Sequence, residues 1–277
     1  MLVGAHVSVA GGMQKAFEWV EEYGCESLQV FTKSQLQWAA KPLDPDEIYA
    51  WLTAWEKEEW EPCMVHNSYL INLSSADEGL RKKSVTGMVE ELERASLLGI
   101  PWVVTHPGAA KGASVEQAIE KCALSVRETL RQTEGCSVGI LIENTAGMGS
   151  HIGARFEELA QILENVALPE QTGVCFDTCH AFAAGYDFRT PESYTEMWRQ
   201  FDRIVGLTHL KGFHLNDCKT PFASRVDRHD AIGQGTIGRK GFELLMNDPR
   251  FEAHPGVTEL PDEVTLESIN LLKNLRK

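Results

Sequence analysis

Gly173-Val174-Cys175-Phe176-Asp177-Thr178-Cys179-His180 is an apolar run that ends in a carboxylate, with an imidazole three residues further on. The residues from Val174 to Phe176 predict a short buried strand. The Asp and His at its end need partners, because an unpaired polar group in a buried position is costly. Each other, the backbone or a metal ion could serve, so the question is whether other strands end in the same way.

A short apolar strand, a polar stop and a longer amphipathic segment recur along the whole chain. Strands are predicted at residues 2–7, 27–31, 63–66, 102–106, 139–143, 173–177, around 213–215 and at 257–259. Helices are predicted at 13–23, 46–59, 77–98, 114–133, 155–165, 191–204, 239–246 and 261–275, with a glycine-bearing loop at 217–238. Eight such units predict one α/β domain, residues 1–277, folded as a (β/α)8 TIM barrel.

An open doubly wound sheet is the alternative fold. It is less favoured because no glycine-rich dinucleotide fingerprint follows the first predicted strand, and we accordingly expect no nucleotide cofactor. The apolar content of 43% and charged content of 24% are ordinary for a soluble protein. No apolar run approaches the roughly 18 residues that span a membrane, and no signal peptide is visible. Seven scattered cysteines indicate a reduced, cytoplasmic protein rather than a disulfide framework.

The predicted strands end in a set of potential metal ligands. All strands of a barrel point their carboxyl ends to one face, so these side chains are expected to converge there. A structural hydrogen bond would explain any one of them, but not the repetition over six consecutive strands. The set consists of His66, His106, Glu143, Asp177, His180, His214 and Glu259, with Asp227 and His229 from the loop after the seventh strand.

Five imidazoles and four carboxylates are the ligand types of divalent zinc or manganese. A catalytic zinc takes three protein ligands and a water, so nine ligands suit two or three ions, with a carboxylate shared between two. Paired metals about 3.5–4 Å apart stabilise the attacking and leaving oxygens of a phosphate displacement. Cys175 and Cys179 lie among apolar residues, and we interpret them as packing rather than as ligands.

The formal charge of −14 by itself disfavours a nucleic-acid partner, whose binding depends on phosphate contacts. Net charge is not the local field, however, and three divalent cations would bring the total to −8.

The chain resembles the endonuclease IV family of apurinic/apyrimidinic endonucleases over essentially its whole length. The specific elements are Asp177-Thr178-Cys179-His180 and Asp227-Arg228-His229. The other matching stretches are Gly4-Ala5-His6-Val7-Ser8, His66-Asn67-Ser68-Tyr69-Leu70-Ile71-Asn72-Leu73, Thr105-His106-Pro107-Gly108, Ile142-Glu143-Asn144-Thr145-Ala146-Gly147 and His214-Leu215-Asn216-Asp217.

The resemblance implies three Zn²⁺ per chain, with Mn²⁺ or Fe as partial substitutes. It assigns the ligands to three centres: His66, His106 and Glu143; then Glu143 again with Asp177, His214 and Glu259; then His180, Asp227 and His229. The implied reaction is hydrolysis of the phosphodiester 5′ to an abasic site in duplex DNA, which leaves a 3′-hydroxyl and a 5′-deoxyribose phosphate. Trimming of blocked 3′ ends is implied as a related activity. Glu143 and Glu259 are the implied catalytic carboxylates, and Glu259 is expected to assist as a base toward the water.

The same resemblance implies that loops on this face recognise DNA. Tyr69 and Leu70 match the family's wedge, and the loop after the second strand supplies another, where Leu36 stands in place of an expected Arg. An apolar wedge can still intercalate, but a polar contact is lost. Candidate phosphate contacts are Lys33, Lys111, Lys219, Arg225 and Arg228. One-to-one binding to a duplex favours a monomer.

A metal-dependent sugar isomerase or epimerase of the related barrel type is the competing function. It has no need for a third ligand group or for a Tyr69-Leu70 wedge. A non-catalytic metal protein is disfavoured because structural sites are closed and usually rich in cysteine. In the leading interpretation Asp177 and His180 bind different ions, and the expected turn Thr178-Cys179 sets the separation between them.

Overall fold

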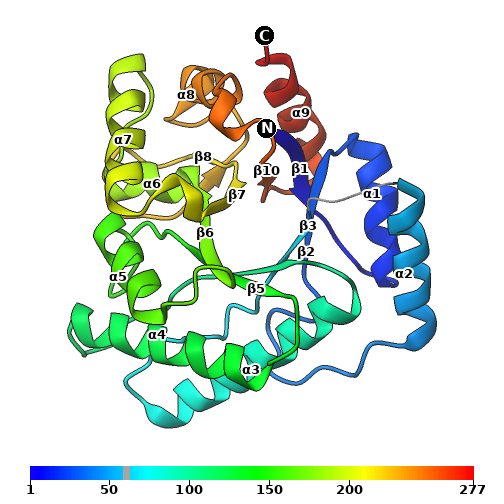
Figure 1. Cartoon of the computed structure of the whole chain (residues 1–277). Helices are drawn as coiled ribbons and strands as arrows, with labels where there is room; N and C mark the ends of the chain where they lie inside the picture. Colours follow the sequence, from blue (N-terminus) through cyan, green and yellow to red (C-terminus); the bar gives the residue numbers. More distant parts are fainter. Residues whose placement is uncertain (59–62) are drawn as a thin grey trace.

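The protein is described by a computed structural model covering residues 1–58 and 63–277. Within those residues, eight parallel strands close a barrel in the order β1-β10-β7-β6-β5-β4-β3-β2. The predicted TIM barrel is therefore confirmed (Figure 1). The barrel strands are β1 Leu2–His6, β2 Ser27–Val30, β3 Cys63–His66, β4 Trp102–Thr105, β5 Gly139–Glu143, β6 Thr172–Asp177, β7 Leu210–His214 and β10 Pro255–Thr258.

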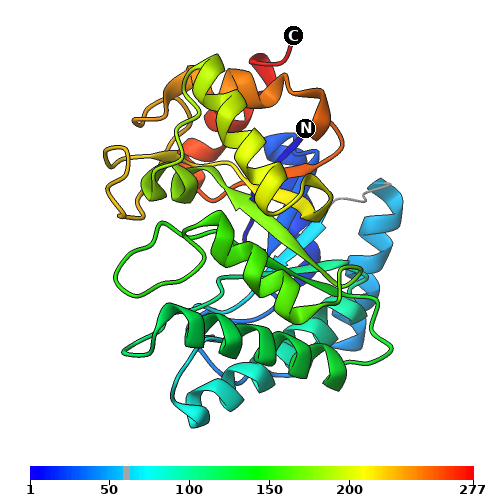
Figure 2. The same ribbon diagram turned by 60° about the vertical axis from the view of Figure 1, so that its left-hand side comes forward.

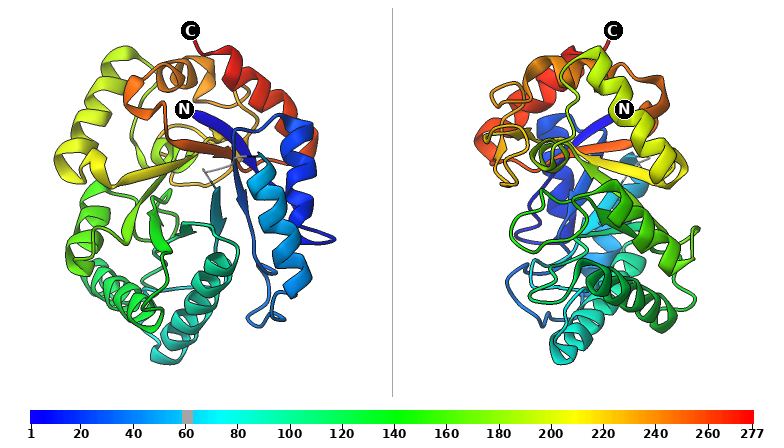
Figure 3. Two further views of the ribbon diagram at one scale, coloured as in Figure 1. Left: turned by 45° about the vertical axis from the view of Figure 1, so that its right-hand side comes forward. Right: turned by 90° about the vertical axis from the view of Figure 1, so that its left-hand side faces the viewer.

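Helices surround the barrel on the outside, as the left view of Figure 3 shows. Their bounds are α1 Ala16–Tyr23, α2 Pro45–Glu58, α3 Glu78–Leu97, α4 Val115–Gln132, α5 Phe156–Val166, α6 Thr178–Ala184, α7 Pro191–Ile204, α8 Gly238–Met246 and α9 Asp262–Asn274, with short 3-10 turns at Met13–Lys15, Leu207–His209 and Pro249–Phe251. The helix predicted at 46–59 is present as α2, and its predicted last residue, Glu59, lies outside the described residues. The part of the chain that the structure describes has no helix that is long and apolar enough to cross a membrane.

Two local predictions were wrong. The expected turn after Asp177 is the first turn of α6, because the Asp177 carboxylate caps that helix by accepting a hydrogen bond from the His180 N–H at 2.6 Å. The loop predicted at 217–238 contains a small antiparallel sheet, in which β8 (Asp217–Cys218) pairs with β9 (His229–Asp230). The sheet places His229 directly opposite Cys218.

The amino-terminal half of the barrel interior is filled by a closed apolar cluster of Met64, Val104, Leu141, Cys175 and Val257. Glycine on β7 makes room for the largest of these side chains: a Cβ at Gly212 would lie 2.8 Å from the Met64 sulfur. Each cluster residue is on a different strand, so five strands contribute side chains to this part of the packed barrel interior.

At the carboxyl ends of the strands the loops are longer. The loop after β5 (green) and the loops after β7 (yellow to orange) project from the same side of the barrel (Figure 2). This is the face on which the predicted ligands were expected to converge.

Candidate metal centre and substrate face

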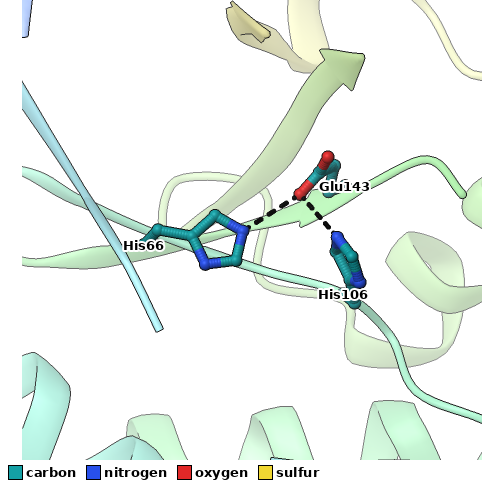
Figure 4. Close-up of side chains that lie close together, drawn as sticks. All are labelled: His66, His106 and Glu143. Atoms are coloured by element: carbon teal, nitrogen blue, oxygen red, sulfur yellow. Dashed lines mark hydrogen bonds and ion pairs between the residues drawn. The ribbon is translucent and has the colours of Figure 1, made fainter. Parts of the chain in front are cut away.

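Glu143, the last residue of β5, is the hub of the site. Its Oε2 lies 3.3 Å from Nε2 of His66 and 3.1 Å from Nε2 of His106 (Figure 4). Its Oε1 lies 3.0 Å from Nδ1 of His214 and 3.1 Å from Nδ1 of His180. The carboxylate is fully buried, so one negative charge is shared among four imidazoles from four different strands or strand ends.

Around this hub the structure brings the predicted ligands together as three groups. In each group the potential ligand atoms lie within 4.8 Å of one another. The groups are His66, His106 and Glu143; Glu143, Asp177, His214 and Glu259; and His180, Asp227 and His229. All nine predicted residues therefore meet at one place, although they span nearly two hundred residues of sequence.

A further group consists of Asp177, Cys179 and His229, whose ligand atoms also lie within 4.8 Å of one another. Cys179 is buried, and its thiol is 3.7 Å from the carbonyl oxygen of Arg228. The prediction that this cysteine only packs thus left out its proximity to two potential ligands.

Two of the imidazoles, those of His66 and His214, are held with one nitrogen toward the cluster and the other bonded outside it. Nδ1 of His66 lies 2.9 Å from the Asn67 carbonyl oxygen, so this nitrogen donates and Nε2 is left for the cluster. Nε2 of His214 is 2.9 Å from Oε1 of Gln29, which leaves Nδ1 as the inward lone pair. A proton fixed on the outer nitrogen by a carbonyl is typical of metal-ligating histidine.

Nε2 of His229 is buried and makes no hydrogen bond among the described residues, although Oδ1 of Asp227 is 3.3 Å away. A buried nitrogen without a hydrogen bond, close to a carboxylate, fits a cation bound by both groups better than a direct bond between them. Together with the donor types, this shows that the residues present suit divalent metal ions.

Side-chain amides orient the carboxylates. Asn216 donates to Oδ2 of Asp177 at 2.7 Å and to Oε2 of Glu259 at 3.2 Å. Gln29 donates to Oε1 of Glu259 at 3.1 Å, and Asn144 accepts from the Asp177 N–H at 2.8 Å. The sequence interpretation did not single out these amides, because Asn and Gln carry no metal-ligand signature of their own.

The electrostatics reflect the crowding of charges. Burial alone would raise the pKa of Glu143, but the neighbouring imidazoles, above all His214 and His106, hold that pKa well below its usual range. Burial raises the pKa of Asp177, against the opposing effect of His180. Burial would lower the pKa of His180, yet the carboxylates of Asp177 and Asp227 raise it well above the ordinary value. Without cations the cluster would therefore take up protons, and divalent ions are the natural substitute.

A cavity of about 330 Å³ opens beside the cluster. Tyr69, Leu70, Lys111 and His151 are among the residues that line it. The sequence interpretation assigned no role to His151. This residue reaches the cavity because it pairs with Ala109 in an antiparallel bridge between the loops after β4 and β5.

Most residues predicted to contact DNA are exposed or lie at the cavity, where a bound duplex could reach them. Tyr69 is 60% exposed and Leu36 is 74% exposed. Arg225 and Arg228 are exposed in the loop after β7, and Leu70 is half-buried at the cavity.

Lys33 is an exception, and the prediction that it contacts phosphate was wrong. Its side chain is only 2% exposed, and its ammonium group donates to Oε2 of Glu90 at 2.8 Å. The paired carboxylate on α3 holds the ammonium away from solvent.

A family model described as "Xylose isomerase-like TIM barrel" matches residues 17–275. Over 270 residues, 97% of this chain and 95% of the relative, the chain is 45% identical to a "Probable endonuclease 4" of Chloroflexus aurantiacus. This chain belongs to the endonuclease IV family.

Solved structures agree with this membership. The crystal structure of endonuclease IV from Thermus thermophilus aligns with a TM-score of 0.88 at 36% identity, covering 99% of this chain and 98% of that one. A D-tagatose 3-epimerase-like protein aligns with a TM-score of 0.77 at 20% identity, covering 99% of this chain and 97% of that one, which shows a shared fold alone. Membership of the endonuclease IV family and the ligand groups around Glu143 together indicate metal use.

Proposed function

We propose that this chain is a metal-dependent DNA-repair endonuclease that hydrolyses the phosphodiester 5′ to abasic sites in duplex DNA, leaving a 3′-hydroxyl and a 5′-deoxyribose phosphate. The convergence of three ligand groups around Glu143 carries the proposal. The groups adjoin a cavity whose wall includes Tyr69 and Leu70, so potential metal ligands and potential wedge residues share one face. Membership of the endonuclease IV family agrees with that arrangement.

Three divalent ions, zinc by preference, would occupy the three groups. When bound, such ions activate a water and neutralise charge on the phosphate and on the leaving 3′ oxygen. Glu143 would hold two centres at a fixed separation, because its two oxygens face different sets of imidazoles. Asp177 and Asp227 would complete the second and third centres.

The residues around Glu259 fit a role in directing a water. Gln29 and Asn216 donate to its two oxygens and so fix the plane of the carboxylate. Burial alone would raise the pKa of Glu259, but His214 and His6 hold it below the usual range, so the group is ionised at neutral pH. The oriented carboxylate would accept a hydrogen bond from a water and align it, with proton transfer a smaller part of its role, because a base works best when its pKa is near the operating pH.

Damage recognition would lie in the exposed loops. An abasic nucleotide is easily extruded, because it has no base to unstack or unpair. Tyr69 and Leu36 would fill the gap in the duplex as apolar wedges, and Arg225 and Arg228 would contact phosphates. Trimming of blocked 3′ ends would use the same centre, because it is hydrolysis of the same type of bond.

A sugar isomerase or epimerase is the competing function. The relevant observation is the His180, Asp227 and His229 group, which gives this barrel a third potential centre that chemistry on a small sugar does not need. We also propose that the protein is a monomer, since one chain carries every ligand group. A cytoplasmic location is proposed as well, since all seven cysteines are free.

The test is incision of a duplex that carries one tetrahydrofuran abasic analogue. The analogue cannot undergo β-elimination, so cleavage reports hydrolysis rather than lyase chemistry. We expect incision immediately 5′ to the analogue with zinc or manganese supplied, and about three metal ions per chain after dialysis. Absence of incision by the metal-loaded protein would rule out the proposed activity, and turnover of ketose sugars instead would support the isomerase.

A further inference from the structure

The loop formed by residues 32–41, between β2 and α2, is attached to α3 by buried charged groups. The ammonium of Lys33 donates to Oε2 of Glu90 at 2.8 Å and lies 3.7 Å from Oε1 of Glu91. It also donates to the carbonyl oxygen of Gly87 at 3.4 Å. Since Glu91 is only 1% exposed, the first residues of the loop are tied to the interior of the molecule.

Arg94 of α3 bonds both ends of the same loop. Its Nε donates to the carbonyl oxygen of Thr32 at 3.1 Å, and its Nη1 donates to the carbonyl oxygen of Lys41 at 2.9 Å. The Thr32 hydroxyl in turn donates to Oε2 of Glu91 at 2.6 Å. One buried guanidinium thus joins the first and the last residue of the loop.

The tip of this loop carries an exposed apolar residue of the substrate face. Leu36 is 74% exposed, and its neighbour Gln35 accepts a hydrogen bond from the Ser68 hydroxyl at 2.8 Å. Ser68 immediately precedes Tyr69, so this hydrogen bond joins the two loops that carry the proposed wedge residues. The loop further rests on α3 through Trp38, whose ring centre is 4.4 Å from Nζ of Lys83.

The charges of the network balance, with two cations and two carboxylates. A buried ion network of this kind contributes little net stability compared with apolar side chains of the same size. The network does impose directional contacts on the loop. Side chains that insert into a substrate bind it best when rigid surroundings hold them in position. The placement of these groups under a wedge loop therefore suggests a positioning role rather than a stabilising one.

We propose that Lys33, Glu90, Glu91 and Arg94 form a positioning network that holds the 32–41 loop in the geometry required to enter damaged duplex DNA. This inference rests on the proposed endonuclease function and adds positioning residues to it. None of the four touches the ligand groups around Glu143, so the network acts on recognition of the duplex and not on the chemistry at the metal centre.

The experiment compares Lys33→Met and Glu90→Gln with the wild-type protein on two substrates. The first is the tetrahydrofuran duplex with 2-aminopurine opposite the lesion, whose fluorescence rises when the base is unstacked. The second is bis(p-nitrophenyl) phosphate, a small diester that needs the metal centre but no wedge. We expect kcat/KM on the duplex to fall by about tenfold or more, with a smaller rise of fluorescence on binding, and kcat/KM on the small diester to stay unchanged.

Lys82→Met is the matched control for Lys33→Met, because it removes the same charge from an exposed position on α3, the helix that carries Glu90 and Glu91. It should leave both substrates unaffected. Glu90→Gln guards against misfolding of the more buried variant, since the Glu90 side chain is 31% exposed and its shape is kept. Wild-type metal content and unfolding midpoint in both variants would establish that the barrel is intact.

Three outcomes would overturn the inference. Duplex incision within twofold of wild type in both variants would show that the network does not position the wedge. An equal loss on both substrates would show that it supports the barrel as a whole. If wild-type protein hydrolyses the small diester but does not incise the duplex, the proposed function fails and the inference falls with it, whereas the first two outcomes leave that function intact.

Discussion

The two halves of the barrel interior differ completely in chemistry although they are built on the same strands. The apolar cluster contains Met64, Val104, Leu141, Cys175 and Val257. Two residues further along each of those strands stands a ligand candidate: His66, His106, Glu143, Asp177 and Glu259. Side chains two apart on a strand face the same way, so both sets point into the barrel. The lower layer buries apolar surface, and the layer above it carries the charged and ionisable groups.

This difference separates stability from function along the barrel axis. The apolar layer gains free energy on burial, whereas the charged layer is costly to bury until its groups are neutralised. Changes in the two layers should therefore have effects of different kinds, which substitutions at Glu143 and Leu141 test, and a change outside both layers should have the smallest effect.

The largest effect is expected from Glu143→Gln in the charged layer. Loss of the shared carboxylate should lower incision of abasic duplex by about a thousandfold and reduce metal content, because two ligand groups depend on it. Incision kinetics and metal analysis measure both. The exposed Glu164→Gln on α5 is the control, and near-normal activity of Glu143→Gln would remove this residue from the centre of the site.

A smaller effect is expected from Leu141→Ala, one layer below the same site. The cavity left by a buried leucine should lower the free energy of unfolding by about 2–4 kcal/mol, while metal content stays at the wild-type level. Urea unfolding of the metal-loaded protein measures the change, with the exposed Leu168→Ala as the control. If Leu141→Ala loses metal without losing stability, the two layers are not independent.

The smallest effect concerns the amino-terminal end, where Glu26 accepts hydrogen bonds from the Val3 N–H at 2.9 Å and from Arg276. Burial alone would raise the pKa of Glu26, but Arg276 holds it below the ordinary value of 4.5. A lowered carboxyl pKa contributes stability above the unfolded pKa and loses it as the pH falls through the folded one.

Glu26→Gln should therefore lower the free energy of unfolding by at most about 1 kcal/mol at neutral pH, because the pair is partly exposed. The difference from wild type should shrink as the pH falls below about 4.5. Unfolding of both proteins in chelator across pH 3–7 measures it, since protonation of the ligand groups is common to both. A difference that widens in acid would contradict the assignment.

The strand ends were readable from sequence, because an apolar run that stops at His or Asp is a local pattern. Strand β3 begins and ends at the predicted residues, Cys63 and His66. Helix α6 was missed because its residues, Thr178–Ala184, are small or aromatic and show no alternation between a polar and an apolar face. The surroundings of Lys33 were also out of reach, since its partner Glu90 is 57 residues away.

The sequence alone therefore determined the repeating units, the fold class and the identity of the nine ligand candidates, because each depends on short-range pattern or residue type. The tertiary structure adds the distances at which they meet around Glu143, the nitrogen of His66 and of His214 that faces inward, and the burial of Lys33 away from the substrate face. Those features depend on closure of the barrel, which brings the ends of distant strands to within hydrogen-bonding distance of one another.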